Sequence, residues 1–153
     1  MSKLTIGHLL RHSPSRGTAG LEAAVIDVAQ DFLLSHLADI GSLDDLAIKG
    51  GTSLRKFYAG NAGRFSTDLD FSIIDPEVSI DAATDSLLSS IAYYENEYFK
   101  YGISECRSKP EITYETDFID RFTLTTKIDI NSPIWLSHKA PLGFNTDPQT
   151  VRD

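Results

Sequence analysis

The spacing of apolar residues predicts two long helices. From residue 20 to residue 40 the apolar positions recur every three or four residues, which is typical of an amphipathic helix. This stripe consists of Leu21, Val25, Val28, Phe32 and Leu33. Gly41 follows at a position where helices commonly end. A second helix is predicted from a cap at Ser79 or Asp81 to about Tyr101, and its expected core face comprises Leu87, Leu88, Ile91 and Tyr98.

Alternating apolar and polar residues predict strands between and after these helices. They are LAIK at residues 46–49, DLDFSII at 68–74, EITYE at 111–115 and RFTLTTKIDI at 121–130. The first strand ends at the Gly50-Gly51 turn, and the following TSLRKFYAG is predicted to form a short helix capped by Thr52 or Ser53. Beyond Pro133 the composition is loop-like. This order of elements predicts an α+β fold, in which helices pack on a mixed sheet.

Length and composition narrow the class of protein. The 153 residues, of which 41% are hydrophobic and 24% charged, are those of a single globular domain. A formal net charge of -8 argues against an extensive nucleic-acid surface, although a local basic patch is compatible with it. The sequence has no apolar run long enough to predict a membrane span. The N-terminus lacks the pattern of a signal peptide. With a single cysteine, these features predict a cytoplasmic protein.

Two aspartates stand on the polar side of the clearest strand. Alternation in STDLDFS places Ser66, Asp68, Asp70 and Ser72 on one face. The Cα atoms of the two aspartates are then about 6.5–7 Å apart. Like charges this close repel unless a cation or solvent separates them. Magnesium prefers hard oxygen ligands and leaves room for phosphate oxygens, so we expect a magnesium site here.

The last predicted strand supplies a third carboxylate. Thr123, Thr125, Lys127, Asp129 and Asn131 share its polar face, opposite Phe122, Leu124, Ile128 and Ile130. If the two strands pair with matching faces, Asp129 joins Asp68 and Asp70. Three carboxylates can hold two metal ions, an arrangement that suits in-line phosphoryl transfer. Lys127 would then stabilise the developing negative charge.

The Gly50-Gly51 turn has the character of a phosphate-binding element. Glycine lets backbone N–H groups approach a phosphate closely, and a helix that follows presents further N–H groups. The hydroxyls of Thr52 and Ser53 add donors, and Lys49, Arg55, Lys56 and Arg64 add local positive charge. The turn is not a Walker A loop, because that motif is absent. A separate histidine pair, His8 and His12, has helical metal-ligand spacing but no third ligand, which favours an ordinary amphipathic turn.

Each of these features is common alone, but their order is specific. The stretch KGGTSLRKFYAGNAGRFSTDLDF, residues 49–71, resembles the first motif of the AbiEii-type (AbiEii/AbiGii, MenT-like) nucleotidyltransferase toxins, a branch of the polymerase-β-like superfamily. Residues 49–52, Leu54 and residues 64–71 carry the resemblance. KIDIN, residues 127–131, is more loosely similar to the family's next acidic strand, with Asp129 in the carboxylate position.

The resemblance implies a function. Such toxins use magnesium to transfer a nucleoside monophosphate from a nucleoside triphosphate, known acceptors include the tRNA 3′ end, and an antitoxin protein neutralises them. Carried over to this chain, Asp68, Asp70 and Asp129 would bind two magnesium ions and, with Lys127, catalyse transfer. The nucleotide would contact Gly50, Gly51, Thr52, Ser53, Lys56, Arg64 and Ser66.

The chain departs from the family in one respect. Family members usually continue into a helical C-terminal half with further motifs, and the sequence to Asp153 contains none of them. We therefore expect residues 1–153 to form a nucleotidyltransferase core domain without that half. Two alternatives stay open. The acceptor could be a protein hydroxyl, or the chain could be a module that binds a nucleotide or a partner without catalysis.

Overall fold

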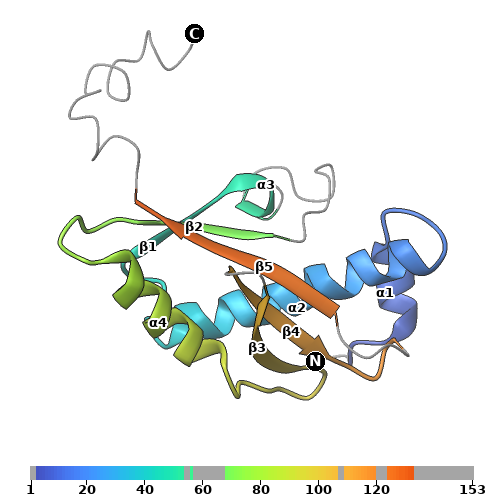
Figure 1. Cartoon of the computed structure of the whole chain (residues 1–153). Helices are drawn as coiled ribbons and strands as arrows, with labels where there is room; N and C mark the ends of the chain where they lie inside the picture. Colours follow the sequence, from blue (N-terminus) through green and yellow to red (C-terminus); the bar gives the residue numbers. More distant parts are fainter. Residues whose placement is uncertain (1–2, 54–55, 57–67, 107–108, 120–123, 133–153) are drawn as a thin grey trace, which may run out of the picture.

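The computed structural model describes residues 3–53, 56, 68–106, 109–119 and 124–132. The elements are α1 (Ile6–His12), α2 (Thr18–Asp39), β1 (Leu46–Lys49), α3 (Gly50–Ser53), β2 (Leu69–Ile73), α4 (Ile80–Ile91), β3 (Lys100–Cys106), β4 (Lys109–Glu115) and β5 (Leu124–Asn131), drawn in Figure 1. None of the described helices is long and apolar enough to cross a membrane.

The strands form one five-stranded mixed sheet in the order β1-β2-β5-β4-β3. The pair β2·β5 is parallel, whereas β1·β2, β4·β5 and β3·β4 are antiparallel. The predicted α+β fold with a mixed sheet is therefore confirmed. The parallel pair matters most for the site, because it brings together two segments that lie far apart in the sequence.

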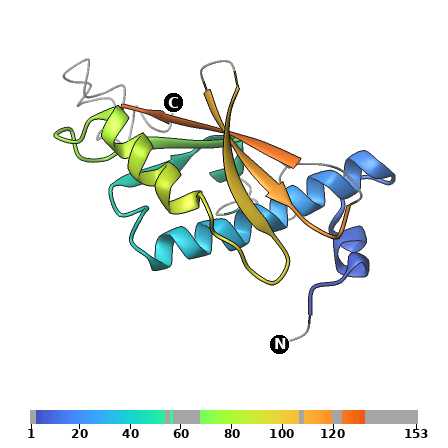
Figure 2. The same ribbon diagram turned by 60° about the horizontal axis from the view of Figure 1, so that its bottom comes forward.

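Helices α2 and α4 cover the same face of the sheet, and α1 packs beside α2 (Figures 1 and 2). Alternation of the strands directs Leu69, Phe71 and Ile73 of β2 and Leu124, Ile128 and Ile130 of β5 into this core. Both apolar stripes are as predicted, with Phe122 outside the described residues. The opposite face of the sheet carries the polar side chains of β2, β4 and β5. Helices α2 and α4 do not lie on this face, which we call the open face.

Helix α2 confirms the prediction for residues 20–40, but the second long helix was predicted too long. α4 ends at Ile91, and Lys100–Cys106 forms the edge strand β3. Tyr93 has a positive φ of 68°, a conformation that interrupts a helix. The Asn96 side chain then accepts backbone N–H bonds from Tyr98 and Phe99, each 2.9 Å long, and so stabilises a turn. Pairing with β4 completes the strand, and local spacing alone does not reveal it.

The short helix after the glycine turn also differs from the prediction. α3 already begins at Gly50, so the predicted N-cap at Thr52 or Ser53 is wrong, and both residues lie inside the helical turn. Their side chains are buried. The remainder of the predicted helix is described only at Lys56.

Candidate active site

The acidic side chains of β2 and β5 meet on the open face of the sheet. Asp70 and Asp129 are register partners in the parallel pair, and Asp68 directly precedes β2. The predicted pairing of these two strands with matching faces is confirmed. Asp68 is exposed, and Asp70 and Asp129 are half-buried. The three carboxylates therefore face solvent from adjacent strands rather than being sealed in the core.

The negative charges act on one another. Burial raises the pKa of the Asp70 carboxyl, and the charges of Asp68 and Asp129 raise it further. Lys49 and Lys109 act in the opposite direction. The protein thus holds Asp70 where its ionised form is disfavoured, which is the electrostatic situation that a divalent cation relieves.

Asp129 has two neighbours with hydrogen-bonding groups. Nδ2 of Asn131 donates to its Oδ2 at 3.1 Å, and Nζ of Lys109 lies 3.8 Å from the same oxygen. Lys109 opens β4, and sequence reasoning missed it because the predicted strand began only at Glu111. Extending the alternation of EITYE by two residues would have placed Lys109 on the polar face.

Gly50 brings the glycine turn directly against the acids. It follows Lys49, the register partner of Asp70, and has a φ of +79°. A Cβ atom at this position would lie 2.7 Å from Oδ2 of Asp70. Only glycine combines the left-handed backbone with so close an approach to a carboxylate. The turn and the acids, which were predicted to be parts of one site, are adjacent.

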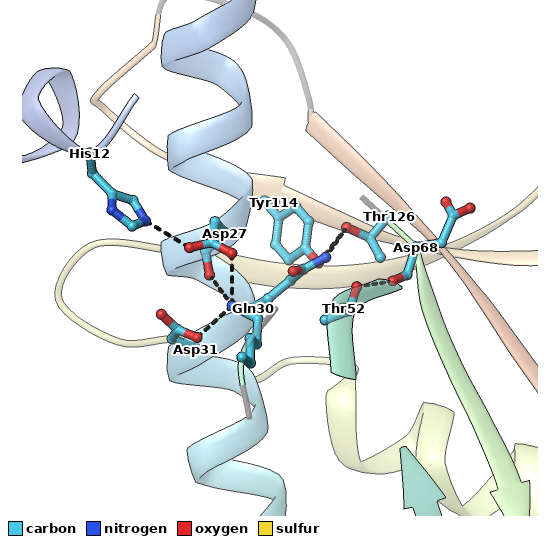
Figure 3. A network of polar contacts seen from close by, with 9 residues as sticks. His12, Asp27, Gln30, Asp31, Thr52, Asp68, Tyr114 and Thr126 are labelled. Atoms are coloured by element: carbon cyan, nitrogen blue, oxygen red, sulfur yellow. Dashed lines mark hydrogen bonds and ion pairs between the residues drawn. The ribbon is translucent and has the colours of Figure 1, made fainter. Parts of the chain in front are cut away.

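Thr52 ties the same turn to the start of β2. Its buried hydroxyl donates a hydrogen bond to the main-chain carbonyl of Asp68 (Figure 3). The bond holds α3 beside the first acid, while the Asp68 carboxylate points away from Thr52. The structure therefore shows Thr52 as a brace for the backbone that carries the acids.

Lys56 is directed toward α2. Its Nζ lies 3.0 Å from Oδ1 of Asp27 and also pairs with Asp31. Oδ2 of Asp27 also lies 2.7 Å from Nε2 of His12, a contact that Figure 3 shows. One buried carboxylate therefore joins α1 and α2 to Lys56. The ammonium group predicted to bind nucleotide is thus engaged with the helix layer.

The remaining predicted residues are placed as follows. Lys127 is exposed on the open face, two residues before Asp129, with Glu111 as its cross-strand partner. Gly51 and Ser53 lie in α3. Arg64 and Ser66 lie outside the described residues.

Within the described part of the chain, no three His, Cys, Asp or Glu side chains converge into a ready-made metal site. The two spaced histidines have other contacts, because Nδ1 of His8 accepts the Thr5 N–H and His12 contacts Asp27. Asp68, Asp70 and Asp129 remain the residues suited to a hard divalent cation, since they offer carboxylate oxygens whose charges are in conflict.

Comparisons with known proteins agree with this geometry. Residues 31–135 match the family model described as "Nucleotidyl transferase AbiEii toxin, Type IV TA system". The chain is also similar in structure to MenT4, a nucleotidyltransferase toxin from Mycobacterium tuberculosis H37Rv, with 33% sequence identity and a TM-score of 0.68. A search of curated proteins gives no significant match.

The extent of these matches matters. The similarity to MenT4 covers 83% of this chain and 44% of the MenT4 chain, so this chain spans less than half of that toxin's length. The family model matches more than half of the chain, from before β1 to just beyond β5. It therefore includes the glycine turn and all three acids. The chain belongs to the AbiEii family of nucleotidyltransferase toxins.

Proposed function

We propose that this chain transfers a nucleoside monophosphate from a nucleoside triphosphate to an acceptor hydroxyl. One observation carries the proposal: Asp70 and Asp129 are partners on adjacent parallel strands, and the Gly50 turn abuts Asp70. Acids on neighbouring strands beside a glycine turn suit the binding of metal-complexed phosphates. Membership of the AbiEii family supports this chemistry, as does the structural similarity to MenT4, itself a nucleotidyltransferase toxin.

In this proposal Asp68, Asp70 and Asp129 hold two magnesium ions. When bound, the ions would supply electrostatic stabilisation of the transferring phosphoryl group. The turn at Gly50 and Gly51, with Ser53, Arg64 and Ser66, contacts the triphosphate. Thr52 keeps the turn in place through the Asp68 carbonyl. Lys127 offsets negative charge that develops as pyrophosphate leaves.

We further propose that the acceptor is the 3′ end of tRNA, that the protein acts in the cytoplasm, and that a cognate antitoxin neutralises it. The resemblance of residues 49–71 to toxins that modify tRNA supports this acceptor. The family's assignment to a type IV toxin–antitoxin system supports the antitoxin. Nucleoside triphosphates and magnesium are both abundant in the cytoplasm.

The test is incorporation of labelled nucleotide. The purified chain is incubated with magnesium, total RNA and protein from a lysate, and each of the four α-labelled triphosphates in turn. We expect label that RNase releases and protease does not. Asp70→Asn should reduce incorporation by about a thousandfold or more, because the charge that binds metal is lost. Asp75→Asn, in the exposed loop after β2, should retain it.

Each other outcome has a definite meaning. Undiminished incorporation by the Asp70 variant would refute the assignment of the acids. Label released by protease would assign the acceptor to a protein hydroxyl. Magnesium-dependent binding of a triphosphate without transfer would make the chain a nucleotide-binding module.

A further inference from the structure

Lys109 is a cation that the structure places at the acidic site and that the sequence motif does not contain. It begins β4, the strand next to β5. The antiparallel register pairs Glu111 with Lys127. Lys109 lies two residues before Glu111, and Asp129 lies two residues after Lys127. In an antiparallel pair the two are therefore level with each other and on the same face. Its Nζ is 3.8 Å from Oδ2 of that carboxylate, and its charge also lowers the pKa of Asp70.

The contact between Lys109 and Asp129 is loose. The side chain of Lys109 is 63% exposed, and that of Asp129 is 41% exposed. Ion pairs of this kind contribute little to stability, because solvent screens them and a long side chain loses entropy in holding one geometry. Lys109 can thus leave Asp129 at small cost and keep its ammonium group near the site.

A metal ion and Lys109 would compete for the Asp129 carboxylate. A carboxylate that serves as a metal ligand no longer needs a lysine, and the ammonium would be repelled by a divalent cation beside it. A metal-bound triphosphate brings several negative oxygens to the same face. An exposed lysine on the neighbouring strand is free to turn toward those oxygens.

Lys127 is placed differently. It projects from the strand that carries Asp129 itself, and its cross-strand partner is Glu111. Lys109 projects from the neighbouring strand, with Asp129 as its ion-pair partner. Of these two lysines, Lys109 is therefore the one that is ion-paired with one of the three acids.

We propose that Lys109 is a substrate-positioning residue that pairs with Asp129 before substrate arrives and moves to the triphosphate when Asp129 ligates metal. The inference rests on the proposed function. It predicts two effects of opposite sign, because Lys109 competes with metal for Asp129 and assists the binding of phosphate. A residue that merely supports the fold would weaken both kinds of binding together.

The experiment uses the whole chain and two simple probes, Mn²⁺ alone and inorganic triphosphate with Mg²⁺. Lys109→Met should bind Mn²⁺ about three- to fivefold more tightly, since a weak competing ion pair is gone. It should bind inorganic triphosphate about tenfold more weakly, since a charged hydrogen bond is lost. Titration calorimetry measures the affinity for inorganic triphosphate. Electron paramagnetic resonance measures the concentration of free Mn²⁺ and so gives the affinity for Mn²⁺.

Two variants serve as controls. Lys109→Arg keeps a flexible cation and should bind triphosphate within about twofold of the wild-type chain. Lys100→Met removes the same charge from the same open face, but from the edge strand β3, where Lys100 is the register partner of Glu115 on β4. It should change neither affinity by more than about twofold.

The outcomes separate this inference from the function on which it rests. If the wild-type chain binds both probes but Lys109→Met leaves triphosphate affinity unchanged, or weakens both affinities, the role of Lys109 is refuted and the proposed function stands. If the wild-type chain binds neither probe, both proposals fail.

Discussion

Two groups of carboxylates in this protein meet lysines in contrasting ways. On the helix side, Asp27 is 4% exposed and is contacted by Lys56 and His12. On the open face, Asp70 and Asp129 are half-buried, and Lys109 is loosely held. The first group lies within the packed layer of helices. The second lies on neighbouring strands and faces solvent.

The difference predicts different roles for the two groups. A buried charge without close partners costs several kcal/mol, so the contacts of Asp27 with Lys56 and His12 stabilise the folded chain. An exposed group tolerates incomplete pairing at small cost. The acids of β2 and β5 retain mutual repulsion, and that repulsion is available to favour a cation or a charged substrate. The comparison predicts that the helix-side group governs stability and the open group governs binding.

Lys56→Met should give the largest effect on stability. It removes the ammonium partner of the buried Asp27 carboxylate, which keeps its contact with His12. The change should cost about 3 kcal/mol of unfolding free energy, measured by urea denaturation. Lys3→Met breaks an exposed pair with Glu97 and should cost less than about 1 kcal/mol.

Lys56→Met also tests the prediction that Lys56 binds nucleotide. A variant of wild-type stability that has lost triphosphate affinity would assign Lys56 to the site and break the comparison.

Gly50→Ala should have an intermediate effect that reaches both properties. Alanine at a φ of +79° costs about 1–2 kcal/mol, and its Cβ would displace the Asp70 carboxylate, so metal and triphosphate affinity should fall as well. Gly17→Ala is the matched control, because Gly17 has a φ of +90° but nothing within 4 Å of an added Cβ. We expect similar losses of stability in the two variants and a loss of binding only at Gly50. Equal binding by both variants would show that the turn does not position Asp70.

Asp70→Asn should have the smallest effect on stability. Unlike the Lys56 and Gly50 variants, it should stabilise the fold. The pKa of Asp70 is raised in the folded chain, so folding favours the protonated carboxyl and the ionised form is destabilising. In EDTA at neutral pH the variant should be more stable than the wild-type chain, by less than about 1 kcal/mol. The difference should shrink as pH falls through the raised pKa, because the wild-type carboxyl then becomes neutral too.

Urea denaturation at a series of pH values measures this difference. Added Mg²⁺ should reverse the order by stabilising only the chain that keeps the full set of acids. A variant that is less stable than the wild-type chain in EDTA would mean that Asp70 supports the fold, contrary to the comparison.

Sequence periodicity was sufficient for the elements that form the centre of the fold. α2 follows from a helical stripe, and β2 and β5 follow from alternation, which also assigns Asp68, Asp70 and Asp129 to polar faces. Periodicity failed at the end of α4 and at β3. There the apolar spacing continued past Ile91, while a turn at Asn96 and pairing with β4 determined the outcome.

The sequence by itself determined which residues carry negative charge and which face of each strand they occupy, because charge follows from residue type and the face follows from alternation along the strand. Only the tertiary structure decided which cation each acid meets. Lys56 reaches Asp27 across 29 positions of the chain, and Lys109 reaches Asp129 from another strand. Such contacts depend on how the helices and strands pack, and the local pattern of residues does not specify that packing.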